Sequence, residues 1–225
     1  MEDDTFDGRI AGATELERRI DWSGALRDYD ALLRALEAEQ VRDGPWQLRY
    51  ADIQFRRGNA LMELRRTDAA RVAIDAGLHA AKASESPLVV AKGLLAAGVF
   101  AGSSGDFIRA ERFLLEALDL CSRDRGIEAR QGAGWAMLNL GSLYGKTGRL
   151  DLAFVTLEKA RERLYGIENW GGVAASWEAQ AQLRRAIGDE DRWREDLAEA
   201  VVFYDRERMT EKSGQLRAML QGKLV

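Results

Sequence analysis

The sequence predicts an all-α fold, a solenoid of about five antiparallel helix pairs followed by a C-terminal capping helix. Three observations predict it. Apolar residues recur at spacings of three and four in a chain rich in alanine, leucine, glutamate and arginine, as on one face of a helix. The 225 residues include only two prolines, too few for the many turns of a β-sandwich. Short breaks that recur about every 40 residues indicate structural repeats.

Composition and charge exclude several classes of protein. The single cysteine precludes an intrachain disulfide, and the single histidine precludes a two-histidine metal site. The net charge of −4 leaves no basic surface for a phosphate backbone. The longest uncharged run, 131–145, is shorter than the roughly 20 residues that cross a bilayer. We therefore expect a soluble, cytoplasmic protein with no nucleic-acid or membrane partner and no metal or cofactor.

The first two helix pairs are predicted over residues 6–42 and 45–83. In the first, the apolar residues that share one helix face are Ala25, Tyr29, Leu32, Leu33 and Leu36. The second begins at Pro45, which suits the first turn of a helix.

The last three pairs are predicted over residues 87–123, 127–167 and 171–208. Ser86 and Pro87 form a helix start, because serine caps free N–H groups and proline suits the first turn. A glycine that can adopt the left-handed conformation ends the first helix of each pair, at Gly105, Gly148 and Gly188. Residues 211–222 then read as one amphipathic capping helix.

A common skeleton emerges when the segments around these glycines are superimposed. The third pair reads Gly98, Gly105, Phe107, Ala110, Leu114, Ala117, and the fourth reads Gly141, Gly148, Leu150, Ala153, Leu157, Ala160. The second pair gives Gly58, Ala70 and Ile74, with Arg65 where the turn glycine would stand. We expect the small residues of the two helices to face each other so that the axes approach closely. We expect the large ones to fill the space between pairs. Each pair leaves an apolar face bare, so the pairs must stack.

This skeleton resembles the tetratricopeptide repeat over about residues 6–208, most closely at Leu140, Gly141, Tyr144, Gly148, Leu150, Ala153, Leu157 and Ala160. The period of 40 to 45 residues exceeds the usual 34 and is similar to the long-helix variety of the family, found in bacterial regulators and adaptor proteins. The resemblance implies one right-handed superhelical domain over residues 1–225. Trp193 departs from the pattern, because a small residue is expected there.

The resemblance also implies that the first helices line an inner surface on which a protein or peptide segment binds. The polar and aromatic residues at the family's contact positions are Arg56, Asn59, Lys92, Trp135, Asn139, Ser142, Lys146, Gln182 and Arg185. Amides of this kind can pair with a peptide backbone, and the cations can hold carboxylates. The apolar residues at such positions, Phe55, Leu95, Val99 and Leu138, are expected in the core rather than in contact with a ligand. The family's lysine–asparagine clamp for a terminal carboxylate has no counterpart at matching positions.

These observations favour a non-enzymatic interaction scaffold without catalytic residues, and they leave three alternatives open. One is a regulatory or sensor module that acts with a separate output protein. A second is self-assembly, including a homodimer, because Trp22, Trp46, Trp170 and Trp193 lie near helix ends and are expected to be exposed. A third is a helical enzyme whose residues converge from distant helices. A phosphate loop at residues 141–147 is disfavoured, because its first glycine is missing and no strand precedes it.

Overall fold

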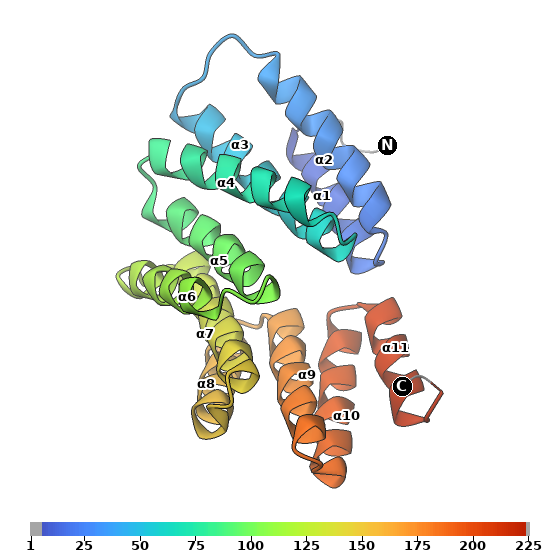
Figure 1. Ribbon diagram of the computed structural model, residues 1–225. Coiled ribbons are helices and arrows are strands. Elements are labelled where there is room, and N and C mark those ends of the chain that lie inside the picture. Colours follow the sequence, from blue (N-terminus) through green and yellow to red (C-terminus); the bar gives the residue numbers. More distant parts are fainter. Residues whose placement is uncertain (1–5, 224–225) are drawn as a thin grey trace.

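The computed structural model describes residues 6–223, which form eleven helices and no strand (Figure 1). The helices are α1 (Phe6–Arg18), α2 (Trp22–Glu37), α3 (Gly44–Glu63), α4 (Thr67–Ala83), α5 (Pro87–Ser103), α6 (Phe107–Ser122), α7 (Ile127–Lys146), α8 (Leu150–Tyr165), α9 (Trp170–Ala186), α10 (Glu190–Arg206) and α11 (Thr210–Leu220). The predicted all-α architecture is confirmed: the helices pack as sequential antiparallel pairs in a solenoid.

The pairs follow one another around an arc, and the first and last pairs lie on the same side of it (Figure 1). The first helices pack on one another in succession: α3 contacts α5, α5 contacts α7 and α7 contacts α9. Within residues 6–223, the second helices of successive pairs do not pack on one another to that extent. The first helices therefore line the tighter, inner side of the arc. Across its opening, Arg18 at the end of α1 lies 3.5 Å from Glu207, which follows α10.

Each turn within a pair contains one residue in the left-handed conformation. Gly105, Gly148 and Gly188 have φ values of +84°, +77° and +78°, as glycine at a helix end predicts. Ile20 and Arg65 occupy the same place in the first two pairs, with φ values of +59° and +58°. Arg65 thus does stand in the glycine's place, although a side chain there is strained.

The two helices of a pair approach closely at a glycine, because glycine has no Cβ. A Cβ built on Gly58, Gly98 or Gly141 would lie 2.6 or 2.7 Å from a side-chain carbon of Ile74, Leu114 or Leu157, respectively. Each large residue belongs to the second helix of the same pair. The close approach expected from the sequence is therefore present, but the glycine accepts a large branched side chain as well as facing a small residue. Only glycine leaves room for it.

The expectation of exposed tryptophans is wrong for the two that lie deepest. Trp46 and Trp193 are each 5% exposed, and Trp22 and Trp170 are half-buried. Trp46 reaches back from the start of α3, and its indole Nε1 donates a hydrogen bond to the carbonyl oxygen of Leu36 at 2.9 Å. Trp193 belongs to the core cluster of the fifth pair, which α11 covers with the buried side chain of Leu216. The side chains of Trp46 and Trp193 are therefore packed inside the fold.

Candidate functional site

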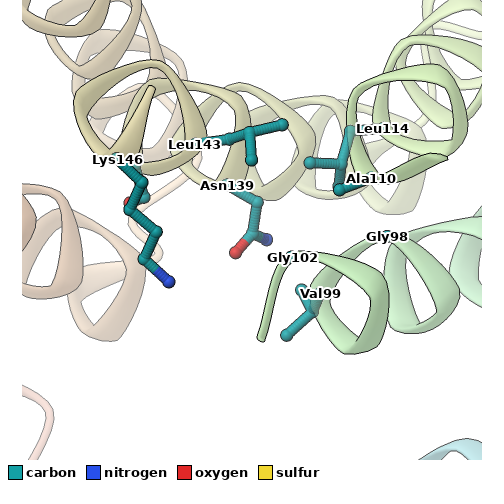
Figure 2. A pocket seen from close by; sticks show the side chains of 9 residues that line it. Gly98, Val99, Gly102, Ala110, Leu114, Asn139, Leu143 and Lys146 are labelled. Atoms are coloured by element: carbon teal, nitrogen blue, oxygen red, sulfur yellow. The ribbon is translucent and has the colours of Figure 1, made fainter. Parts of the chain in front are cut away.

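A small cavity opens where α5 and α7 meet above α6. Its volume is about 70 Å³, and its lining residues are Gly98, Val99, Gly102, Ala110, Leu114, Asn139, Ser142, Leu143 and Lys146. Its floor is aliphatic, because Ala110, Leu114 and Leu143 are buried. Gly102 of α5 leaves space here, since a Cβ built on it would meet no atom closer than 3.6 Å. Figure 2 shows Asn139 and Lys146 extending from α7 on the side where Val99 of α5 lies.

Three of the predicted contact residues line this cavity together. The spacing of Asn139, Ser142 and Lys146 places them on one face of α7. The Asn139 Nδ2 donates to the carbonyl oxygen of Trp135 at 2.9 Å, and the Ser142 Oγ donates to that of Leu138 at 3.1 Å. Within the described part of the chain, neither the Asn139 Oδ1 nor the exposed Lys146 ammonium has a polar partner. The cavity rim thus carries one open acceptor and one open cation.

The remaining predicted residues lie elsewhere. Asn59 and Gln182 are exposed and form no hydrogen bond within residues 6–223. Lys92 lies 3.8 Å from a carboxylate oxygen of Glu128, and the Arg185 guanidinium lies 5.3 Å from the centre of the Trp193 ring. Trp135 is half-buried and packs on the core. The structure therefore distributes these side chains over several helices instead of gathering them in one site.

Arg56 is engaged in a polar cluster between α1, α2 and α3. Its Nε donates to Asp52 at 2.9 Å, and its Nη1 donates to the Thr14 Oγ1 at 3.1 Å. Burial lowers the pKa of Arg56, but the Asp52 carboxylate outweighs it and holds that pKa above its usual value. Nearby, burial raises the pKa of Glu17, which accepts a hydrogen bond from the Tyr29 hydroxyl at 2.8 Å. Arg56, which the sequence predicts as a ligand-contact residue, thus has intramolecular partners in the fold.

The apolar residues at the inner positions divide into two groups. Phe55 and Leu138 are buried, as expected for core residues. Leu95 and Val99 remain partly exposed, and Val99 lines the cavity. Val99 is therefore not the core residue that the sequence predicts, because its side chain lines the cavity.

A buried polar network between α8, α9 and α10 was not anticipated from the sequence. The Gln180 Nε2 donates to both Asp196 carboxylate oxygens at 3.0 Å, and its Oε1 accepts from Arg161 at 3.2 Å. Arg184 lies 3.7 Å from the same carboxylate. Burial raises the pKa of Asp196, although the Gln180 hydrogen bonds and then Arg184 oppose that rise. The sequence does contain a signal for this network: Gln180 and Asp196 directly precede the core residues Ala181 and Leu197.

Two kinds of reactive group can be checked among the described residues: metal-binding clusters and the single thiol. Among them, no group of three or more histidine, cysteine, aspartate or glutamate side chains could hold a metal ion. Cys121 is buried, and burial followed by the charge of Asp124 raises the pKa of its thiol. A thiol with a raised pKa is a weak nucleophile. None of the described helices has the length and apolar character required to cross a membrane.

Comparisons with known proteins agree with this architecture. A model of the tetratricopeptide repeat matches residues 136–162, which cover the end of the cavity-lining helix α7 and most of α8. One segment of the chain therefore matches the tetratricopeptide repeat, within a solenoid of antiparallel helix pairs of that type. Tetratricopeptide repeat domains generally mediate protein–protein interaction, and their scaffolds are typically non-catalytic.

Two solved structures match this chain over most of its length. BtubC (BKLC) from P. vanneervenii superposes with a TM-score of 0.61 at 18% identity, over 96% of this chain and 81% of that one. A tetratricopeptide repeat protein from Parabacteroides merdae ATCC 43184 gives a TM-score of 0.33 at 14% identity, over 94% and 98% of the two chains. At such identities, the likeness to BtubC extends to the fold alone. No curated protein sequence matches the chain significantly.

Proposed function

We propose that this chain is a non-enzymatic scaffold that binds a peptide or protein segment along its inner surface. The cavity between α5, α6 and α7 would be the central subsite. The observation that carries the proposal is the pairing of an aliphatic hollow with an open cation and an open acceptor, Lys146 and the Asn139 Oδ1. The other predicted contact residues, among them Asn59, Gln182 and Arg185, would extend the binding surface along α3 and α9.

The size of the cavity suggests what it would accept. A dry cavity of about 150 Å³ holds benzene, whereas this one measures about 70 Å³. It would therefore take an aliphatic side chain of alanine or valine size rather than an aromatic ring. The Lys146 ammonium would pair with a carboxylate beside that side chain, from an acidic residue or from a chain end. The Asn139 Oδ1 would accept a backbone N–H of the segment.

A peptide library displayed on phage and selected against the full chain tests the proposal. Selected peptides should combine a small aliphatic residue with a nearby carboxylate. Their dissociation constants should rise at least about tenfold with Asn139→Ala combined with Lys146→Glu, because two hydrogen-bonded or ionic contacts of about 1 kcal/mol each are lost.

Lys159→Glu is the matched control. Lys159 is an exposed lysine on α8 of the same pair and does not line the cavity. Its replacement should leave the dissociation constants within about twofold, as expected for a charge outside the contact. Equal losses in both variants, or a library without enriched peptides, would show that the inner surface is not the binding site.

A further inference from the structure

A second hollow lies between α7 and α8, and we call it the basic cleft. Its volume is about 390 Å³, and its lining residues are Arg130, Met137, Lys159, Glu162 and Arg163. Met137 and Asn139 are two residues apart, so they point to nearly opposite sides of α7. The basic cleft is therefore separate from the cavity on which the proposed function rests, and that function makes no use of it.

Three cations from two helices converge on the basic cleft. Lys159 and Arg163 are one turn apart, so they share a side of α8. Within the part of the chain that the structure describes, neither of them has a salt bridge or a hydrogen bond. Arg130 of α7 reaches the end of α8, where its Nη2 donates to the carbonyl oxygen of Gly166 at 3.2 Å. That bond holds the guanidinium beside the cleft and leaves its other N–H groups without a partner among residues 6–223.

Nearby carboxylates reduce this positive charge without cancelling it. Glu162 lies in the lining, and Glu158 precedes it by one turn of α8. Burial lowers the pKa of Arg161, and Asp196 first and then these two glutamates oppose that effect. Both glutamates therefore act on Arg161, a cation outside the lining. The three lining cations, Arg161 and the two glutamates together have a net charge of +2.

The charges of the neighbouring elements lie outside the basic cleft. α6 carries Glu116 and Asp119, but none of its residues lines the cleft, and Asp119 forms a salt bridge with Arg123. Glu128 near the start of α7 lies 3.8 Å from Lys92 of α5. The cleft is consequently positive through residues of α7 and α8 alone.

The repeat itself does not require the three cations. At the position of Lys159, the second, third and fifth pairs carry Ala76, Glu116 and Glu199. At the position of Arg163 they carry Ala80, Leu120 and Phe203, and at that of Arg130 they carry Gln47, Pro87 and Trp170. A cation in the last turn stabilises a helix, which accounts for Arg163 but not for Lys159, six residues before the end of α8. The three cations are therefore a feature of the fourth pair.

A compact polyanion matches the basic cleft better than an extended acidic peptide does. Ligand pockets usually measure about 300–1,000 Å³, so the cleft suits a small molecule. Guanidinium groups bind phosphate oxygens through paired hydrogen bonds, and a lysine adds a point charge. Successive side chains of an extended peptide point to opposite sides and lie about 7 Å apart on one side, so they would not converge on one hollow.

We propose that the basic cleft binds a small diphosphate ester. Arg130 and Arg163 hold the phosphate oxygens, and Lys159 supplies the third positive charge. Met137 contacts the carbon atoms next to the diphosphate, and the Glu162 carboxylate accepts a hydrogen bond from a hydroxyl group of the same molecule. The site is independent of the inner surface, so either proposal can fail alone.

The Met137 methyl group is a probe inside the cleft. The full chain with isotope-labelled methionine methyl groups is titrated with inorganic diphosphate to about 1 mM, the upper end of weak dissociation constants. The resonance that disappears in Met137→Leu should shift, whereas those of Met62 and Met209, which pack on other core clusters, should not. Shifts of all the methionine resonances, or of none, would overturn the proposal.

Calorimetric titration with inorganic diphosphate measures what the cations contribute. Lys159→Gln with Arg163→Gln should raise the dissociation constant at least about 30-fold, because two charged contacts are lost. Arg71→Gln with Lys82→Gln is the matched control, since it removes the same charge from exposed positions of α4. Its dissociation constant should stay within about twofold of the wild type. Equal losses in the two double variants would contradict a site at the cleft.

Two further titrations test the class of ligand and the independence of the site. Inorganic phosphate should bind at least about tenfold more weakly than diphosphate, because it reaches fewer of the cations. A tetra-aspartate peptide that binds as tightly as diphosphate would overturn the proposal, since the cleft would then be an unselective basic surface. Asn139→Ala with Lys146→Glu should leave diphosphate binding within about twofold of the wild type. A large loss in that variant would place the diphosphate on the inner surface instead.

Discussion

The fourth and fifth helix pairs share one backbone arrangement and are filled in different ways. In the fourth pair, Gly141 of α7 receives Leu157 of α8, and the buried residues around them are aliphatic apart from Tyr144. In the fifth, Ala181 takes the glycine's place and Trp193 takes that of a small alanine. The polar network of Gln180 and Asp196 lies beside them. The same repeat can therefore be stabilised by the fit of side chains in one pair and by hydrogen bonds between buried polar groups in the next.

The polar contacts that join each of these two pairs to the pair before it also differ, one being partly exposed and the other buried. The fourth pair is joined to the third by the partly exposed Arg149–Glu111 ion pair, and the fifth is joined to the fourth by the buried Arg161–Gln180–Asp196 chain. Exposed ion pairs contribute little, whereas a buried charge is costly once its partner is removed. A single substitution should consequently do most harm in the fifth pair.

Gln180→Leu should have the largest effect on stability. Leucine has a similar size, but Asp196 would lose both hydrogen bonds from Gln180 and Arg161 would lose an acceptor. We expect the free energy of unfolding to fall by about 3 kcal/mol, measured by urea denaturation followed by circular dichroism. Gln182→Leu, two residues away and exposed, should change it by less than about 0.5 kcal/mol. Equal effects would mean that the network adds nothing to the fifth pair.

Gly141→Ala should have the next largest effect. The new Cβ would lie 2.7 Å from the Leu157 Cγ and 3.2 Å from its backbone nitrogen, and the backbone cannot move aside cheaply. Overpacking of this kind costs about 1–3 kcal/mol. Gly102→Ala in α5 is the control, because its Cβ would meet no atom closer than 3.6 Å, and alanine favours a helix by up to about 1 kcal/mol. Urea midpoints that move the same way in both variants would contradict the role of shape in the fourth pair.

Much of the fold could be predicted from the sequence. The recurring glycines at 105, 148 and 188 indicate the turns, and the spacing of Gly141, Ala153 and Leu157 indicates the close helix pair. The left-handed conformations of Ile20 and Arg65 could not be predicted from residue type, because neither residue favours it and the flanking helices impose it. The indole of Trp46 reaches a carbonyl ten residues away, which proximity to a helix end does not reveal.

The candidate site, too, can be predicted from the sequence only in part. Helical spacing alone places Asn139, Ser142 and Lys146 on one face, and all three line the cavity. The hollow itself depends on Gly102 of a different helix, and a missing side chain gives no positive signal in a sequence. Gln180 and Asp196 were missed because their burial arises only when successive pairs stack. Ligand binding at these positions stays a prediction.

The two links should also respond to pH in opposite directions. Burial raises the pKa of Asp196, so the folded chain holds that proton more tightly than the unfolded chain. Its contribution to stability is therefore greatest in acid and declines as the pH rises from the ordinary aspartate range through the raised pKa. Hydrogen bonds from Arg149 lower the pKa of Glu111. Its contribution is present above the ordinary glutamate range and disappears as the pH falls through the lowered pKa.

Melting temperatures of the wild type, Asp196→Asn and Glu111→Gln between about pH 3.5 and 6.5, the range around ordinary carboxyl pKa values, separate the two links. As the pH rises, the wild type should lose stability relative to Asp196→Asn and gain it relative to Glu111→Gln. The Glu111 effect should be the smaller and should shrink in 0.5 M salt, at about a 4 Å screening length, because that pair is partly exposed. Slopes of the same sign would mean that the buried and the exposed link do not differ electrostatically.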